Sequence, residues 1–145
     1  MRVYVGAKFE NKEAVRAAHA ALAKAGMFIS YDWTPHTAQG RVGAPLVRKM
    51  QTEAVEDFDG VVNADAMIFL HDANCQGGFI ELGIALGSGK LVCVVGGRPG
   101  SQRFPIFYFH PNVHLFDTVE AAIEFLHWAD TAFAGPVPET YNHGY

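Results

Sequence analysis

The fold is decided by the apolar run AMIFL (66–70) and by the glycine-containing stretch NCQGGFIELG (74–83) that follows it. This order predicts a strand, a glycine turn and a helix over residues 78–87. Glu81 then lies in the first helical turn, where free backbone N–H groups stabilise negative charge, so we expect an ionised carboxylate at neutral pH. Such a carboxylate beside an open glycine loop is either a charge that favours the helix start or a nucleophile.

The rest of the chain alternates apolar extended segments with amphipathic ones. The expected strands are residues 2–7, 27–31, 66–71, 91–95 and 113–116, and the expected helices are residues 11–25, 44–63, 78–87 and 118–134. In the second helix, the apolar spacing predicts one buried face made of Leu46, Met50, Ala54, Phe58 and Val61.

This alternation predicts a single doubly wound α/β domain over residues 1–134, followed by a tail over residues 135–145. The five-stranded parallel sheet takes the order 2-1-3-4-5, a flavodoxin-like arrangement. Ligands bind where the strand order reverses, here between strands 1 and 3, outside the carboxyl ends of the strands. Topology therefore places Glu81 at the expected pocket. The long polar loop over 32–43 resembles a pocket wall more than a spacer.

Length and composition limit the class of protein. The chain has 145 residues, half of them apolar, which is enough for one domain with a core. No apolar run approaches the roughly 20 residues of a membrane helix, and the strand-like VYV (3–5) leaves no room for a signal peptide. The net charge of −4 without a basic cluster argues against a nucleic-acid polymer as partner. We expect a cytoplasmic protein with no membrane partner.

Cofactor, metal and thiol sites find little support in the sequence. The seven histidines are scattered, and no Cys/His cluster has the spacing of metal ligands. No Gly-x-Gly-x-x-Gly follows the first strand, so we expect neither a cofactor nor a metal. Cys93 lies in an apolar strand and Cys75 in the glycine loop, so we expect no disulfide. Cys75 with His71 would suit a thiol nucleophile, yet the pair shows no local signature.

Several short segments, in a fixed order and spacing, resemble the nucleoside 2-deoxyribosyltransferase family over nearly the whole chain. They are VYVGA (3–7), DFDG (57–60), ADAMI (64–68), GGFIELG (77–83), ALGSGK (85–90) and PNV (111–113). The resemblance implies an enzyme that cleaves an N-glycosidic bond and transfers 2-deoxyribose to another base or to water. Its partners would be a small-molecule nucleoside and a free nucleobase.

The resemblance also implies roles for individual residues. Glu81 matches the nucleophile, Asp57 an acid close to the base, and Asp72 best matches a second acid that contacts the base. Asn112 matches an asparagine that approaches the sugar from a neighbouring subunit, and Tyr145 matches a C-terminal tyrosine that also approaches the sugar. The further substrate-binding candidates are Tyr4, Gly6, Phe9, Trp33 and Gly78.

The chemistry of these residues agrees with that role. Displacing a base from C1′ of deoxyribose passes through an oxocarbenium-like state, which a carboxylate beneath the sugar stabilises or captures covalently. A second acid protonates the departing base, and Glu81 with Asp57 or Asp72 supplies the pair. From composition alone, a Glu81 that only favours its helix start and a solvated Asp57 are the simpler interpretation. Tyr4 equally suits a core position, and Trp33 equally suits a loop anchor.

The loop after the first strand, AKFEN (7–11), departs from the resembling family. Relatives that hydrolyse nucleoside monophosphates hold the phosphate with a loop rich in Ser, Arg and Gly, whereas this loop has one lysine opposed by a glutamate. This favours an unphosphorylated nucleoside, although Lys8 or Arg41 could still bind phosphate. The loop over 34–43 has no counterpart that can be aligned, so the base preference is not assigned.

The tail begins with the apolar FAGPVP (133–138) and contains Tyr141 and Tyr145. A solvated tail is normally polar and poor in aromatics, so we expect this one to pack on the domain or on a neighbouring subunit. A homo-oligomer follows, either a dimer or a trimer of dimers. Two alternative functions stay open: an N-glycoside hydrolase of a (deoxy)nucleoside or its 5′-monophosphate, and a non-catalytic nucleotide-binding sensor.

Overall fold

Five parallel strands form one sheet in the computed structural model, which describes residues 1–37, 44–97 and 105–131. Their order is β2-β1-β3-β4-β5, so the predicted α/β class, strand number and strand order are confirmed. The second strand is shorter than predicted. The bounds are β1 (Arg2–Gly6), β2 (Phe28–Ile29), β3 (Ala66–Leu70), β4 (Leu91–Val95) and β5 (Val113–Phe116).

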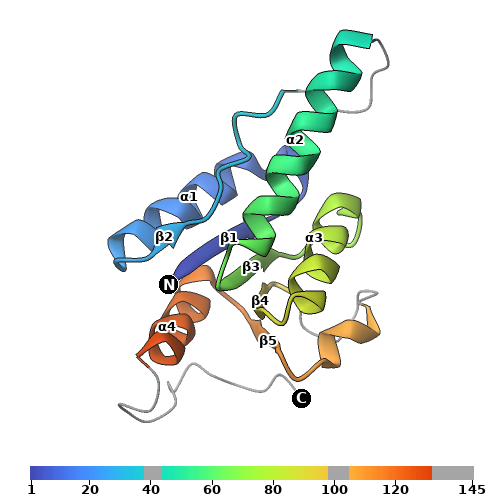
Figure 1. Cartoon of the computed structure of the whole chain (residues 1–145). Helices are drawn as coiled ribbons and strands as arrows, with labels where there is room; N and C mark the ends of the chain where they lie inside the picture. Colours follow the sequence, from blue (N-terminus) through green and yellow to red (C-terminus); the bar gives the residue numbers. More distant parts are fainter. Residues whose placement is uncertain (38–43, 98–104, 132–145) are drawn as a thin grey trace.

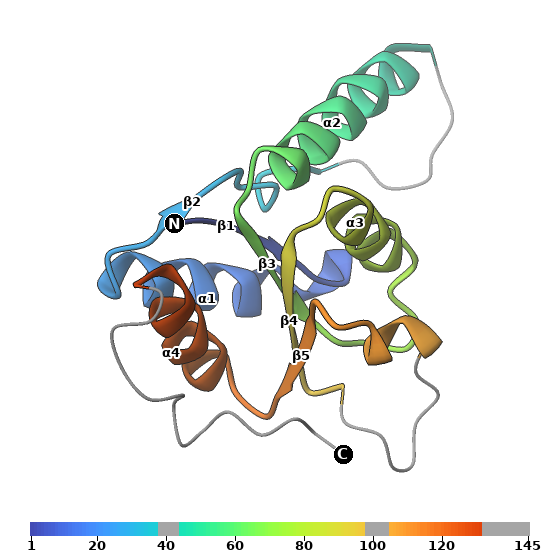
Figure 2. The ribbon, with the colours of Figure 1, turned by 60° about the horizontal axis from the view of Figure 1, so that its bottom comes forward.

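The helices of the described residues cover the sheet on both sides. α1 and α4 lie on one face, and α2 and α3 lie on the other (Figure 1, Figure 2). Cover on both faces explains why β3 and β4 are continuous apolar runs. The α-helices are α1 (Lys12–Lys24), α2 (Ala44–Val62), α3 (Gln76–Gly87) and α4 (Val119–Asp130), and the short 3₁₀ helices are η1 (Phe9–Asn11) and η2 (Ile106–Phe109).

The core lies in the middle of β1, β3 and β4. Val3, Tyr4 and Val5 have no exposed surface, and the same is true of residues 66–69 and 92–94. Tyr4 is the residue in this set with a polar tip, and a buried tyrosine hydroxyl needs a hydrogen-bond partner. The partner comes from α3, which packs over this part of the sheet.

The loop after β2 is tied down on the sheet by Trp33. Its indole Nε1 donates to the Val5 carbonyl at 2.7 Å, and the side chain is buried. The ring also stacks on Phe9, with 6.3 Å between the ring centroids. The loop anchor predicted as one interpretation of Trp33 is confirmed, and this anchoring fixes the course of residues 32–37.

The predicted buried face of α2 is largely wrong. Of its members only Val61 is buried; Leu46 and Met50 are partly buried, Ala54 is exposed and Phe58 is 50 % exposed. The amino-terminal part of α2 extends beyond the sheet (Figure 2), because the edge strand β2 is two residues long and offers it no surface. Apolar spacing identifies the side of a helix that can be buried, but it does not show whether a partner lies beneath it.

Two smaller differences from the predictions concern the ends of helices. α3 begins at Gln76, two residues before the predicted start, and α4 ends at Asp130. Cys75 and Cys93 are both buried and free. None of the helices in the described ranges combines the length and hydropathy needed to span a bilayer. The tail over 135–145 lies outside the described residues.

Candidate active site

A pocket of about 340 Å³ opens beyond the carboxyl end of β1, beside the helices α2 and α3, where the strand order reverses. Residues from four parts of the chain meet there, and among them are five of the predicted site residues: Phe9, Trp33, Asp57, Gly78 and Glu81. The volume falls in the range of small-molecule sites. The switch-point position that topology predicts for the pocket is therefore confirmed.

Glu81 presents one satisfied and one unsatisfied oxygen. Its Oε1 accepts a hydrogen bond from the Tyr4 hydroxyl at 3.0 Å, while Oε2 is buried and has no hydrogen-bond partner. The carboxylate lies directly against the end of β1, because a Cβ at Gly6 would come within 2.7 Å of Oε2. Only glycine at position 6 leaves room for this approach. An unpaired carboxylate oxygen in a pocket is available to a ligand.

The prediction that Glu81 is ionised at neutral pH because of a helix terminus is wrong. α3 begins earlier than predicted, so Glu81 lies in the second turn, where backbone N–H groups are already bonded. Burial raises the pKa of Glu81 to about 8; the hydrogen bond from Tyr4 opposes this shift, and the charge of Asp57 adds to it. Burial and Glu81 in turn raise the pKa of Tyr4, which keeps its hydroxyl a donor.

Asp57 supplies the second carboxyl group of the pocket. It lies on α2, its Oδ1 is buried without a hydrogen-bond partner, and its burial raises its pKa to about 6. His36 opposes this shift, and Glu53 and Glu56 add to it. A carboxyl group with a pKa near neutrality can hold a proton and release it.

Two of the predicted residues, Asp72 and Asn112, do not meet the others in the described chain. Asp72 does not line the pocket: its Oδ1 accepts the Asn74 N–H at 2.8 Å, and its Oδ2 lies 3.7 Å from Lys8 Nζ. Asn112 directly precedes β5, at the amino end of the strands and thus opposite the pocket. Tyr145 lies outside the described residues, as does Arg41. Their predicted roles stay predictions.

His36 and Glu53 are titratable pocket residues that the sequence analysis did not single out. His36 lines the pocket beside Asp57, with 3.9 Å between His36 Nδ1 and Asp57 Oδ2, and its side chain is 11 % exposed. The available signal was weak: a histidine in the long polar loop after strand 2, which leaves the sheet next to the switch point. No group of three or more His, Cys, Asp or Glu residues is placed to hold a metal ion in the described part of the chain.

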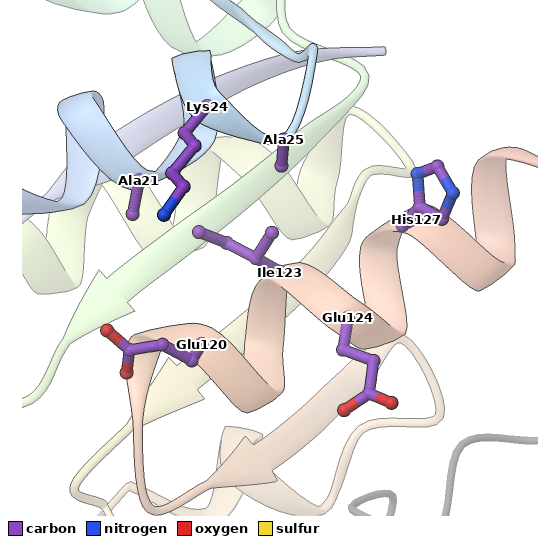
Figure 3. Close-up of a pocket in the computed structure, with 7 residues that line it drawn as sticks. All are labelled: Ala21, Lys24, Ala25, Glu120, Ile123, Glu124 and His127. Carbon is purple, nitrogen blue, oxygen red and sulfur yellow. The ribbon is translucent and has the colours of Figure 1, made fainter.

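A second hollow, of about 500 Å³, lies between α1 and α4 on the other face of the sheet (Figure 3). The hollow exists because Ala21 and Ala25, which face Ile123, have small side chains. The charged groups at its rim, such as Glu120 and His127, point away from one another. None of the described lining residues has a buried unpaired polar atom there. The hollow therefore has no feature that selects a ligand.

Two solved structures with the same fold are enzymes of nucleoside chemistry. No family model and no curated protein matches the sequence. A CMP N-glycosidase from Clostridium botulinum, BcmB, is 17 % identical, with a TM-score of 0.57, over 88 % of this chain and 99 % of its own. A 2-deoxyribosyltransferase from Bacillus psychrosaccharolyticus is 16 % identical, with a TM-score of 0.64, over 86 % of this chain and 92 % of its own.

The chain thus has the α/β fold of these two enzymes, with a pocket at its switch point lined by the carboxyl groups of Glu53, Asp57 and Glu81. The resemblance to the nucleoside 2-deoxyribosyltransferase family implied this fold, and the structure confirms that expectation.

Proposed function

We propose that this protein is an enzyme that cleaves the N-glycosidic bond of 2′-deoxynucleosides and transfers the deoxyribose to another nucleobase. One observation carries the proposal: Glu81 Oε2 and Asp57 Oδ1 are both buried without hydrogen-bond partners, and both residues line the same pocket. Burying unpaired carboxyl oxygens costs stability, so the arrangement favours a role in binding or catalysis over a structural one.

The geometry supports a covalent mechanism. Tyr4 engages Glu81 Oε1 and leaves Oε2 to attack C1′. The C1′–N bond breaks, its electron pair stays on the base nitrogen, and that nitrogen takes a proton from Asp57. A C1′–O bond to Glu81 replaces it. The incoming base then attacks C1′, returns a proton to Asp57 and releases the Glu81 carboxylate.

The two carboxyl groups share the protons of the pocket. The charge of Asp57 raises the tendency of Glu81 to stay protonated, because two negative charges in one buried site repel each other. With a pKa of about 8 for Glu81 and about 6 for Asp57, the free protein holds a proton mainly on Glu81 at neutral pH. Catalysis requires the opposite distribution, with the proton on Asp57 and the charge on Glu81. Positive charge at C1′ in the transition state favours that distribution.

A hydrolase of the same architecture is the second candidate, because the CMP N-glycosidase shares the fold. Binding of a 5′-phosphate has less support. No Lys or Arg is among the described residues that line the pocket, and Lys8 lies near Asp72. We therefore infer a preference for unphosphorylated nucleosides and rank hydrolysis of a monophosphate below transfer. The two unpaired carboxyl oxygens also argue against a binding protein without catalysis.

Incubation with a 2′-deoxynucleoside, with and without a second free base, tests the proposal. Chromatography should show a new nucleoside only when the second base is present. Release of free base without an acceptor would instead favour the hydrolase. A 2-fluorinated deoxynucleoside should leave a mass adduct on a peptide that contains Glu81, and Glu81→Gln should remove the adduct. Absence of both exchange and release across purine and pyrimidine substrates would contradict the enzyme.

A further inference from the structure

The hydroxyl of Tyr31 connects His36, which faces Asp57 at the pocket, with Glu56 on α2. It lies 2.7 Å from Glu56 Oε2 and 2.8 Å from His36 Nε2. We propose that Glu56, Tyr31 and His36 form a hydrogen-bonded chain that sets the tautomer of His36, so that His36 and Asp57 together hold the proton given to the leaving base. This inference rests on the proposed function, and His36 acts in it as a positioning residue.

The tautomer follows from counting protons. A tyrosine hydroxyl has one proton, and Tyr31 donates it to the Glu56 carboxylate, which can only accept. The contact between Tyr31 and His36 therefore requires His36 Nε2–H as the donor. The lone pair of Nδ1 is then directed toward the side of the ring where Asp57 Oδ2 lies at 3.9 Å. A neutral imidazole with this tautomer accepts the Asp57 proton or its hydrogen bond.

The ring is held in place independently of the pocket. The His36 N–H donates to the Trp33 carbonyl at 2.9 Å, and Lys12 Nζ donates to the His36 carbonyl. The ring also packs against Tyr31, with 5.7 Å between the ring centroids. The gap of 3.9 Å to Asp57 exceeds a hydrogen bond, and such contacts tighten when a substrate closes the site.

The charges around the pair favour a stored proton. Burial raises the pKa of Asp57; His36 opposes this shift, and Glu53 and Glu56 on α2 add to it. From the other elements, Lys12 of α1 approaches only the backbone of His36. The titratable groups that face the pair are Tyr31 from the end of β2, Glu53 and Glu56 from α2, Glu81 from α3 and Tyr4 from β1.

Each turnover leaves the proton balance of the pair unchanged. When the C1′–N bond breaks, the electron pair on the base nitrogen takes the proton from Asp57, leaving neutral His36 beside a carboxylate. The incoming base carries an N–H proton, which it gives back to the pair as it attacks C1′. No proton has to enter from bulk water, so the sugar can pass between bases in a closed site.

If Tyr31 and Glu56 only held the loop on α2, substitutions would slow all substrates equally. The proposed role instead predicts a loss that depends on the leaving base. His36→Gln and Tyr31→Phe should lower kcat by about 10- to 100-fold for 2′-deoxyuridine or 2′-deoxyguanosine, since protonation of the base contributes at least that much. The loss should be below about threefold for 5-fluoro-2′-deoxyuridine or N7-methyl-2′-deoxyguanosine, whose bases leave with less help. An equal loss for both kinds of substrate would overturn the proposal.

His19 offers a matched control. It is 12 % exposed, and its Nδ1 lies 3.7 Å from an Asp32 oxygen, yet it does not line the pocket. His19→Gln should leave the ratio of the two substrates unchanged. In an Asp57→Asn background, His36→Gln should cause no further loss, because the two residues act on one proton. An additive loss would assign His36 a separate role and overturn the inference.

Nuclear magnetic resonance of the unliganded protein separates this inference from the proposed function. The ¹⁵N shifts of His36 should report an Nε2–H tautomer in the native protein and a mixture of tautomers in Tyr31→Phe. A His36 without tautomer preference would overturn the inference even in an active enzyme. The expected shifts in a protein that turns over no nucleoside would contradict only the proposed function.

Discussion

The two ends of the pocket have different structural support. Glu81 lies on α3, packed over the buried strands β1 and β3 and bonded to Tyr4 in the core. Asp57 lies on α2, where Val55 is 60 % and Phe58 is 50 % exposed, and where polar contacts tie the helix to the loop after β2. Packing therefore fixes the predicted nucleophile, and hydrogen bonds fix the predicted proton donor. We expect substitutions near Glu81 to have the largest effect on cleavage of the glycosidic bond, and substitutions near Asp57 to affect proton transfer to the base.

The largest effect is expected at the Glu81 end. Glu81→Gln should lower kcat by about 10⁴-fold or more, since removal of a nucleophile leaves only binding and electrostatics. Circular dichroism should show an unchanged fold, because glutamine has the same size and can still accept from Tyr4. Turnover within tenfold of the native enzyme would show that the carboxylate is not the nucleophile.

At the other end, Asp57→Asn should lower kcat by roughly 10²- to 10⁴-fold for nucleosides with poor leaving bases and less for good ones. Asp72→Asn is the matched comparison, because Asp72 shapes its own loop and does not line the pocket. A similar dependence on the leaving base in Asp72→Asn would assign the proton to Asp72 instead.

Crowding the Glu81 end tests its geometry without removing a functional group. Gly6→Ala places a Cβ within 2.7 Å of Glu81 Oε2 and 2.5 Å of Met67 Cε, so the carboxylate must move. We expect kcat/KM to fall by up to about 100-fold, as misplacements near 1 Å do. Gly83→Ala, where a Cβ meets no atom within 4 Å, is the control and should keep full activity. Equal activities of the two variants would mean that the site tolerates displacement of Glu81.

The stability of the protein should depend on pH through Glu81. Its pKa is raised from 4.5 to about 8, so the native state binds more protons than the unfolded state between these values, and stability falls as pH rises through that window. Glu81→Gln removes this loss. The Tm of the variant minus the Tm of the native protein should therefore be several degrees larger at pH 8.5 than at pH 4, as measured by calorimetry. A constant difference in Tm would contradict the raised pKa.

The smallest effect concerns the phosphate. We expect kcat/KM for a 5′-monophosphate to be about tenfold below that of its nucleoside, the equivalent of about 1.4 kcal/mol for an uncompensated charge. The reason is the lack of Lys or Arg among the described lining residues. A higher kcat/KM for the monophosphate would favour the hydrolase and would direct attention to Lys8 and Arg41.

The topology could be predicted because it depends on local patterns. Apolar runs of strand length and the turn at the glycine loop fix the order of elements, and the handedness of crossovers fixes the strand order. The position of Glu81 at the switch point follows from that order alone. That Glu81 lines the pocket could therefore be predicted without knowledge of side-chain contacts.

The ionisation of Glu81 and the role of His36 could not be predicted because they depend on contacts between distant segments. Glu81 is buried by Tyr4 and Gly6, which lie far away in the sequence, and this burial outweighs any local effect of the helix. His36 reaches the pocket because Trp33 anchors its loop and Tyr31 bridges it to Glu56. No spacing rule links residues in a loop to residues on the following helix.

Tyr4 also lies against both helices that carry the two carboxyl groups of the proposed reaction. Its hydroxyl meets Glu81 on α3, and the edge of its ring would lie 3.2 Å from a Cβ at Gly60 on α2. One aromatic ring thus spans the gap between the helices that carry Glu81 and Asp57. We therefore expect a smaller side chain at this position to leave a space between the two helices and to loosen the position of Glu81 relative to Asp57.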